Sequence, residues 1–205
     1  MAPVRVAELI SSFRIGDPHL ALGQAISRYI SVLILLLAVC SWTLIARGAS
    51  ASFLGEFSNL RYTEEHAYGY SVLLWKEGEK LFGLFYDSEG LAGDTPVGLL
   101  EDIQLDSSGK LSFRAKLSIG AIYLGHGKQE PTHDIFTFKG SLSQNGISGV
   151  LTHEEQHQSK PRPVTTNIQL PKLAKSEQAE LFQASSYADW RTLVDPVLKT
   201  RGPKW

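Results

Sequence analysis

The sequence predicts a mainly β fold: an antiparallel up-and-down barrel of about eight strands, with an apolar targeting helix before it and a helix after it. Three observations predict this fold. Short apolar runs alternate with turn residues from residue 53 to about residue 170. A charge-free apolar run precedes them. After these runs, apolar residues recur at every third or fourth position instead of every second one.

The amino-terminal part of the chain has the features of an export signal. The run 29–46, YISVLILLLAVCSWTLIA, is apolar and uncharged, and arginine residues precede it. The sequence ASA, which ends at Ala51, has the small-x-small pattern of a signal-peptidase site. We therefore assign residues 1–51 to a signal peptide or a signal anchor. Cleavage after Ala51 predicts a secreted or periplasmic protein, and without cleavage the run anchors the chain in the membrane.

The composition excludes several classes of partner and cofactor. The chain has 20 Lys and Arg against 21 Asp and Glu, so we expect no nucleic-acid partner, and membrane contact only through an uncleaved amino-terminal segment. Cys40, the only cysteine, lies in the apolar run, so the exported part has neither a disulfide nor a thiol nucleophile. No phosphate-binding loop, dinucleotide fingerprint or Gly-x-Ser-x-Gly motif is present, and we expect no cofactor.

The barrel domain is predicted to span residues 52–170. Its clearest strand is 110–119, where apolar residues at the odd positions alternate with polar ones at the even positions, as in an antiparallel sheet with one dry face. The expected strands are 55–63, 69–77, 80–87, 97–106, 110–120, 134–143, 147–154 and 165–170.

Turn residues separate these strands. Glu77–Glu79 predicts a tight hairpin, and Asn145-Gly146 predicts another because both residues tolerate a positive φ. The longer connections 87–96 and 120–133 are expected to be loops. Glycines inside strands commonly mark bends, and such curvature favours a closed barrel. These glycines are Gly83, Gly98, Gly140 and Gly149.

Residues 171–205 are predicted to form a helix and a tail that pack on the barrel. The helix is expected over 176–194, with Ser176 as its N-cap and Pro196 limiting its length. A narrow apolar stripe recurs every three or four residues. Its positions are Phe182, Ser186, Trp190, Leu193 and Val197. The alternative is a free helix that binds a protein partner.

The sequence THEEQH contains His153, Glu154 and His157 in the spacing H-E-x-x-H of zinc peptidases. On a helix, both imidazoles reach one zinc ion, but on a strand the same positions lie about 13 Å apart. Strand-forming residues and two glycines precede the motif, and a proline-containing segment follows it. We therefore expect a polar strand end without metal, and keep His153 and His157 as metal-ligand candidates only for the alternative reading.

Aromatic side chains are dense on the second and third expected strands. The short connection between these strands predicts that Trp75 lies near Phe82. Phe82 is expected either to pack in the barrel core or to line a ligand pocket. His126, between two glycines in the long loop, is expected to be exposed.

Gly55-Glu56-Phe57 stands at the first strand, where lipocalins carry Gly-x-Trp, with Phe in place of Trp. The architecture over about residues 53–190 thus resembles the calycin barrels of lipocalins and avidins. No match to the biotin-contacting residues of avidins is present. The resemblance implies the fold and, at the barrel mouth, a place for a small apolar ligand.

Three functions stay open on this basis. We favour an exported non-catalytic β-barrel protein that binds a small apolar ligand or serves the cell envelope. The second is a zinc-dependent hydrolase using the motif at 153–157. The third is a protein-interaction module using the carboxy-terminal helix or the long loops. A barrel interior filled by side chains would argue against the ligand-binding form of the first.

Overall fold

The computed structural model describes residues 50–91, 95–156 and 162–205, which belong to one compact unit. The expected targeting segment therefore lies outside the described residues, apart from its last two. Within the part that is described, no helix has both the length and the apolar character needed to cross a membrane.

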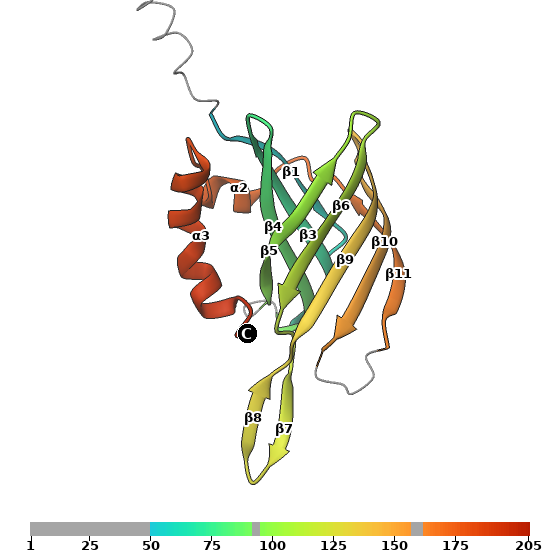
Figure 1. The fold of residues 1–205 in the computed structure, drawn as a ribbon, viewed down its shortest axis with the longest axis vertical. Coiled ribbons are helices and arrows are strands. Elements are labelled where there is room, and N and C mark those ends of the chain that lie inside the picture. Colours follow the sequence, from blue (N-terminus) through green and yellow to red (C-terminus); the bar gives the residue numbers. More distant parts are fainter. Residues whose placement is uncertain (1–49, 92–94, 157–161) are drawn as a thin grey trace, which may run out of the picture. The chain divides into compact units, whose positions relative to one another are not determined.

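Eight antiparallel strands form one curled sheet, and each pairs with the next of them along the chain (Figure 1). All eight expected strands are confirmed. In order they are β1 (Ser52–Ser58), β3 (His66–Glu77), β4 (Lys80–Leu91), β5 (Val97–Leu105), β6 (Lys110–Leu117), β9 (Asp134–Leu142), β10 (Gly146–Glu155) and β11 (Val164–Pro171). A short strand, β2 (Arg61–Tyr62), pairs with the beginning of β3.

The curled sheet is a half-barrel rather than the closed barrel expected, and its two edge strands meet only at one end. There, Phe57 of β1 forms a bridge with Lys172, and the backbone N–H of Leu173 donates to the carbonyl oxygen of Glu56 over 2.8 Å. Among the described residues this is the only bridge between the two edges. A register shift between Phe53 and Gly55 marks a bulge in β1, and bulges bend an edge strand away from regular pairing.

Two of the glycines that predicted bends, Gly140 and Gly149, lie directly opposite each other on β9 and β10. A Cβ atom on Gly140 would lie 2.2 Å from the carbonyl oxygen of Ser148, and one on Gly149 would lie 2.4 Å from that of Lys139. The two strands therefore approach at this point more closely than any residue with a side chain allows. The close approach permits the strong curvature of the sheet.

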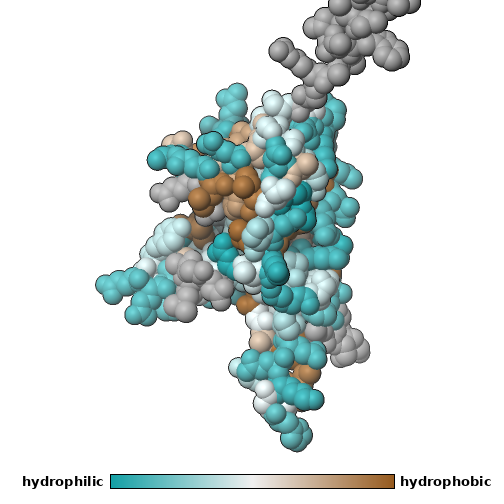
Figure 2. Space-filling view, turned by 90° about the vertical axis from the view of Figure 1, so that its left-hand side faces the viewer, coloured by the Kyte–Doolittle hydropathy of each residue, from teal (hydrophilic) through white to brown (hydrophobic). Residues whose placement is uncertain are grey.

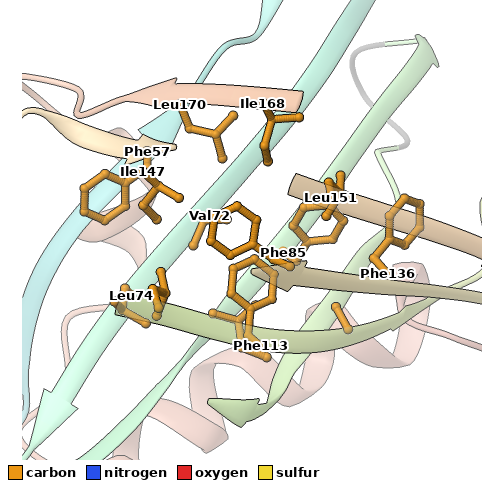
Figure 3. Close-up of a cluster of buried hydrophobic side chains, with 14 of the residues drawn as sticks. Phe57, Val72, Leu74, Phe85, Phe113, Phe136, Ile147, Leu151, Ile168 and Leu170 are labelled. Atoms are coloured by element: carbon orange, nitrogen blue, oxygen red, sulfur yellow. The ribbon is translucent and has the colours of Figure 1, made fainter. Parts of the chain in front are cut away.

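Apolar side chains fill the inside of the curl. Figure 3 shows Val72, Phe113 and Leu151, from separate strands, pointing into the same space. Burying each such side chain stabilises the fold by roughly 1.5–3 kcal/mol. This inner cluster comprises Phe57, Val72, Leu74, Phe85, Leu100, Leu111, Phe113, Ala115, Leu117, Phe136, Phe138, Ile147, Leu151, Ile168 and Leu170.

The outside of the sheet carries a second cluster, which the carboxy-terminal helix covers. Trp190 and Val194 of that helix are fully buried against aromatic and aliphatic residues that point outward from the strands. This outer cluster comprises Leu73, Trp75, Phe82, Leu84, Tyr86, Val97, Phe182, Trp190 and Val194. The sheet is thus dry on both faces where the helix covers it.

The carboxy-terminal region contains two helices rather than the single helix expected over residues 176–194. They are α2 (Glu177–Leu181) and α3 (Tyr187–Arg201), and Pro196 lies inside α3 instead of limiting it. Pro196 is exposed, so water can reach the carbonyl group that its missing N–H leaves without a donor. The expected boundary was therefore wrong.

Serine caps explain where the two helices begin. Ser176 accepts a hydrogen bond from the N–H of Ala179, which confirms the expected cap. Ser186 caps α3 in the same way and interrupts the helix between them. The interruption changes the buried face of α3: Val194 is buried, whereas Leu193 of the expected stripe is 39% exposed.

The long connection 120–133, expected to be a loop, contains a β-hairpin. Its strands, β7 (Ala121–Gly125) and β8 (Lys128–Pro131), pair only with each other and extend beyond the half-barrel (Figure 1). Nearly every residue of the hairpin is exposed. Without one buried face it lacks the alternation by which a strand is recognised in a sequence.

Candidate functional site

Four polar side chains face inward at one end of the half-barrel: Tyr70 of β3, Asp87 of β4, Asp134 of β9 and His153 of β10. Each lies two residues along its strand from a member of the inner cluster, so strand alternation turns it to the same side. Tyr70 lies directly opposite Asp87 on the neighbouring strand. Asp134 lies opposite Glu155, which follows His153 by two residues on β10. We refer to these four residues as the polar cluster.

Asp134 is the hydrogen-bonding centre of the polar cluster. It is 1% exposed and accepts hydrogen bonds from Thr132 Oγ1 at 2.5 Å, from the backbone N–H of Ile119 at 3.0 Å and from His153 Nε2 at 2.8 Å. Burial alone would raise the pKa of Asp134, but these three donors outweigh it and hold the pKa below its usual range.

The same contact favours the charged form of His153. The hydrogen bond to Asp134 raises the pKa of His153 against the opposing effect of burial. Its ring lies flat on that of Phe136, with centroids 4.4 Å apart and planes 4° apart. Asp134 of β9 is therefore hydrogen-bonded to β10 and to the backbone that follows β6 at this end of the sheet.

The Asp134–His153 pair resembles half of a hydrolase charge relay, but no nucleophile is hydrogen-bonded to its imidazole among the described residues. In the described ranges, His153 makes its side-chain hydrogen bond with Asp134, and no hydroxyl or thiol side chain donates to its ring. A nucleophile in hydrogen-bond reach of its base is what acyl-transfer sites require. Within the described residues, the two side chains form an ion pair that links β9 and β10.

Asp87 differs from Asp134 because its carboxyl group has no hydrogen-bond partner among the residues that the structure describes. The residue is 2% exposed, and neither carboxyl oxygen meets a donor among the described residues. Burial, and then the charge of Glu89, raise the pKa of Asp87 to about 7; the charge of Asp134 adds to this and that of His153 opposes it. Burial, followed by the charges of Asp87 and Glu89, likewise raises the pKa of Tyr70 to about 12.

A cleft of about 560 Å³ adjoins the polar cluster. Asp87 and Glu89 border the cleft from the end of β4, and Gly120 borders it from the root of the hairpin. On the other side lie Arg201, at the end of α3, and Lys204, in the tail that follows. Ligand sites of proteins have volumes of about 300–1,000 Å³. This end cleft therefore has the size of a small-molecule site and carries charges of both signs.

The residues of the predicted zinc motif are not arranged as a zinc site in the described part. His153 and Glu154 lie on β10, so their side chains point to opposite faces of the sheet. His157 lies outside the described residues. Among those that are described, no three His, Cys, Asp or Glu side chains come together as a metal site. The reading of His153 and His157 as zinc ligands stays a prediction.

The polar cluster contains two acids, Asp87 and Asp134, that reasoning from the sequence did not select. A signal was present in the alternation pattern. Asp134 precedes Phe136 and Phe138 at spacing two, and Asp87 follows Phe85 at spacing two. A carboxylate on the dry face of a strand is buried, and buried charges need partners. His126, in contrast, lies exposed at the hairpin tip, with a φ of 49°.

Comparison of the chain with protein-family models, with curated proteins and with solved structures finds no match.

Proposed function

We propose that this protein is an exported, non-catalytic binding protein of calycin-like architecture that holds a small polar ligand in the end cleft. Residues 1–51 supply the targeting helix. If signal peptidase cleaves after Ala51, the binding domain is released as a secreted or periplasmic protein. Otherwise the helix anchors it, and a role at the cell envelope follows.

The observation that carries this proposal is the carboxyl group of Asp87. Buried polar atoms in folded proteins are nearly always hydrogen-bonded, and an unsatisfied one destabilises the fold by about 1–3 kcal/mol. Both oxygens of Asp87 lack a partner among the described residues, and the residue borders a cleft of ligand size. Both oxygens are themselves buried, so a ligand that donates hydrogen bonds to them would have to enter the wall of the cleft, and it would then remove the penalty.

The packing of the inner cluster bears on where the ligand binds. Phe85 lies 6.1 Å from Phe113 and 5.1 Å from Phe136 between ring centroids, and Phe113 stacks on Phe138 at 5.0 Å. Rings at these distances are in direct contact. This packing favours the end cleft over the interior of the curl, and hence a polar ligand over the apolar ligand expected from the calycin resemblance.

Nuclear magnetic resonance tests this proposal with two probes on the domain of residues 52–205. Glycylglycine should shift the backbone amide signals that border the end cleft, such as those of Glu89, Gly120 and Gly202. The variant Asp87→Asn should weaken these shifts, and Glu79→Gln, an exposed acid at the opposite end of β4, should not. The proposal is wrong if 1-octanol shifts the amides of Val72 and Phe113 while glycylglycine leaves the cleft unchanged.

A protein-interaction module is the second candidate, and the projecting hairpin favours it. Tyr123 is 75% exposed and Leu124 is 53% exposed near its tip. Large apolar side chains exposed together commonly mark contact surfaces. If the hairpin mediates self-association, light scattering should report oligomers at high concentration that Leu124→Ser abolishes, with Tyr62→Ser, an exposed residue elsewhere, as control.

A further inference from the structure

The walls of the end cleft separate opposite charges. Asp87 and Glu89 supply carboxylates from β4 and Glu130 supplies one from β8, whereas Arg201 supplies a guanidinium group from the last turn of α3. Lys204 adds a second cation, but its ammonium group donates to the carbonyl oxygens of Lys199 and Thr200 and thereby closes the end of the helix. Arg201 is therefore the cation that a ligand could use.

These charged groups do not neutralise one another. Among the described residues, neither Glu89 nor Arg201 forms an ion pair within 4.0 Å, and Asp87 has no hydrogen-bond partner. Elsewhere on the surface, acids and bases pair directly, as Arg191 and Asp195 do at 2.6 Å. The cleft thus keeps charges of opposite sign apart on different elements.

From this arrangement we infer that the ligand of the end cleft is a small zwitterion. Its ammonium group binds to the Asp87 and Glu89 wall, and its carboxylate binds to Arg201. An ammonium group carries three donors, which suits the two unsatisfied oxygens of Asp87, and a guanidinium group binds a carboxylate through two parallel hydrogen bonds. The inference rests on the proposed function, because it names the ligand class of the same cleft.

Two simpler ligands fit the charges less well. A metal cation would need several ligating side chains together, and the described residues contain no such group. A ligand that carries only a positive charge would leave the guanidinium of Arg201 without a partner. A cleft of about 560 Å³ accommodates both ends of a molecule of dipeptide size.

Titration calorimetry on the full chain, purified in a mild detergent, tests the inference with three matched probes at pH 7, where the α-amino groups of the probes are mostly protonated. Glycylglycine carries both charges, glycylglycinamide lacks the carboxylate, and N-acetylglycylglycine lacks the ammonium group. We expect glycylglycine to bind at least about tenfold more tightly than either analogue, because each charged hydrogen-bonding contact contributes at least that factor.

Two variants assign each contact to its wall. Arg201→Gln should weaken the binding of glycylglycine about tenfold and leave glycylglycinamide unchanged. Asp87→Asn should weaken both of these probes and leave N-acetylglycylglycine unchanged, and Glu79→Gln should alter none of the three. Circular dichroism of each variant checks that the fold is retained.

The possible failures are distinguishable. If one single-charge analogue binds as tightly as glycylglycine, and Asp87→Asn or Arg201→Gln weakens it, the zwitterion inference is wrong while binding at the cleft stands. If no probe binds the unmodified chain, or if binding is the same in both variants, the inference and the proposed function are both wrong.

Discussion

Phe82 of β4 stacks on Trp75 of β3, its direct cross-strand partner, with ring centroids 6.3 Å apart and planes 7° apart. The pairing expected from the short connection between these strands is confirmed. Both rings, however, face outward from the sheet. Trp190 of α3 covers them at 4.8 Å from Phe82 and 5.5 Å from Trp75. Phe82 therefore neither belongs to the inside of the barrel nor lines a pocket there.

Replacing Phe82 with alanine should lower the free energy of unfolding by about 3–5 kcal/mol, as for other large buried aromatic residues. Phe82 is 3% exposed and also meets Tyr187 at 5.0 Å, so the truncation leaves a cavity beneath α3. Urea unfolding measures the loss, and Tyr62→Ala, at a residue 70% exposed, is the control. A loss below about 1 kcal/mol would contradict tight packing of the helix on the sheet.

The stability of the protein should decrease as the pH rises from about 4 to 7, owing to Asp87. The pKa of Asp87 in the folded protein is about 7, above its ordinary value of 3.8, so the folded state binds more protons than the unfolded state in this window. The contribution of Asp87 to stability therefore falls with rising pH and levels off above pH 7. The pKa of His153 is raised from its ordinary value of 6.5, so His153 adds a further loss of stability that begins near pH 6.5 and continues as the pH rises. The pKa of Asp134 is lowered, so Asp134 contributes a loss of stability only as the pH falls below about 4.

The variant Asp87→Asn isolates the contribution of this carboxyl group, because asparagine stays neutral. At pH 8 the variant should exceed the unmodified protein in unfolding free energy by on the order of 2–4 kcal/mol, and at pH 4 the two should be similar. Urea unfolding at both pH values gives the comparison. Glu79→Gln should show no such difference. An equal stability of Asp87→Asn and the unmodified protein at pH 8 would mean that Asp87 is not buried as a charge.

Gly146→Ala should destabilise the fold by roughly 1–3 kcal/mol through steric overlap. A Cβ atom at Gly146 would lie 2.5 Å from the carbonyl oxygen of Leu170 on the neighbouring strand. Gly90→Ala is the matched control, since nothing lies within 4 Å of its added carbon. Thermal melts of the two variants measure the difference, and equal melting temperatures would refute the close contact between β10 and β11.

The domain from residue 52 onward should fold without a metal ion. His153 already bonds to Asp134, and a strand separates residues four positions apart too far for one zinc ion. Metal analysis of the purified domain should find no stoichiometric zinc, and a chelator should leave its thermal melt unchanged. Stoichiometric zinc together with a melt lowered by chelator would support the hydrolase alternative.

The hairpin expected at Asn145-Gly146 is confirmed, since it joins β9 to β10. Its geometry differs from the one expected, because neither residue adopts a positive φ. The N–H of Ser143 instead donates to the carbonyl oxygen of Gly146 over 2.9 Å and closes a longer turn. Gly146 is required for a different reason: a Cβ atom there would lie 2.5 Å from the carbonyl oxygen of Leu170 on β11, a strand distant in sequence. At Gly78, by contrast, the φ angle of 57° matches the tight hairpin expected from the local residues Glu77–Glu79.

The sequence by itself determined the β fold, the eight strands, their consecutive antiparallel order and a helix at the carboxy end. These features depend on alternation and on turn residues, which act between neighbours along the chain. The tertiary structure alone decided which face of β3 and β4 lies inside the curl, because both faces of these strands carry apolar residues and alternation cannot rank them. It also decided that Asp87, Asp134 and His153 meet. Their proximity follows from the curvature and register of strands that are far apart in sequence. The three side chains lie together only because the sheet is curled.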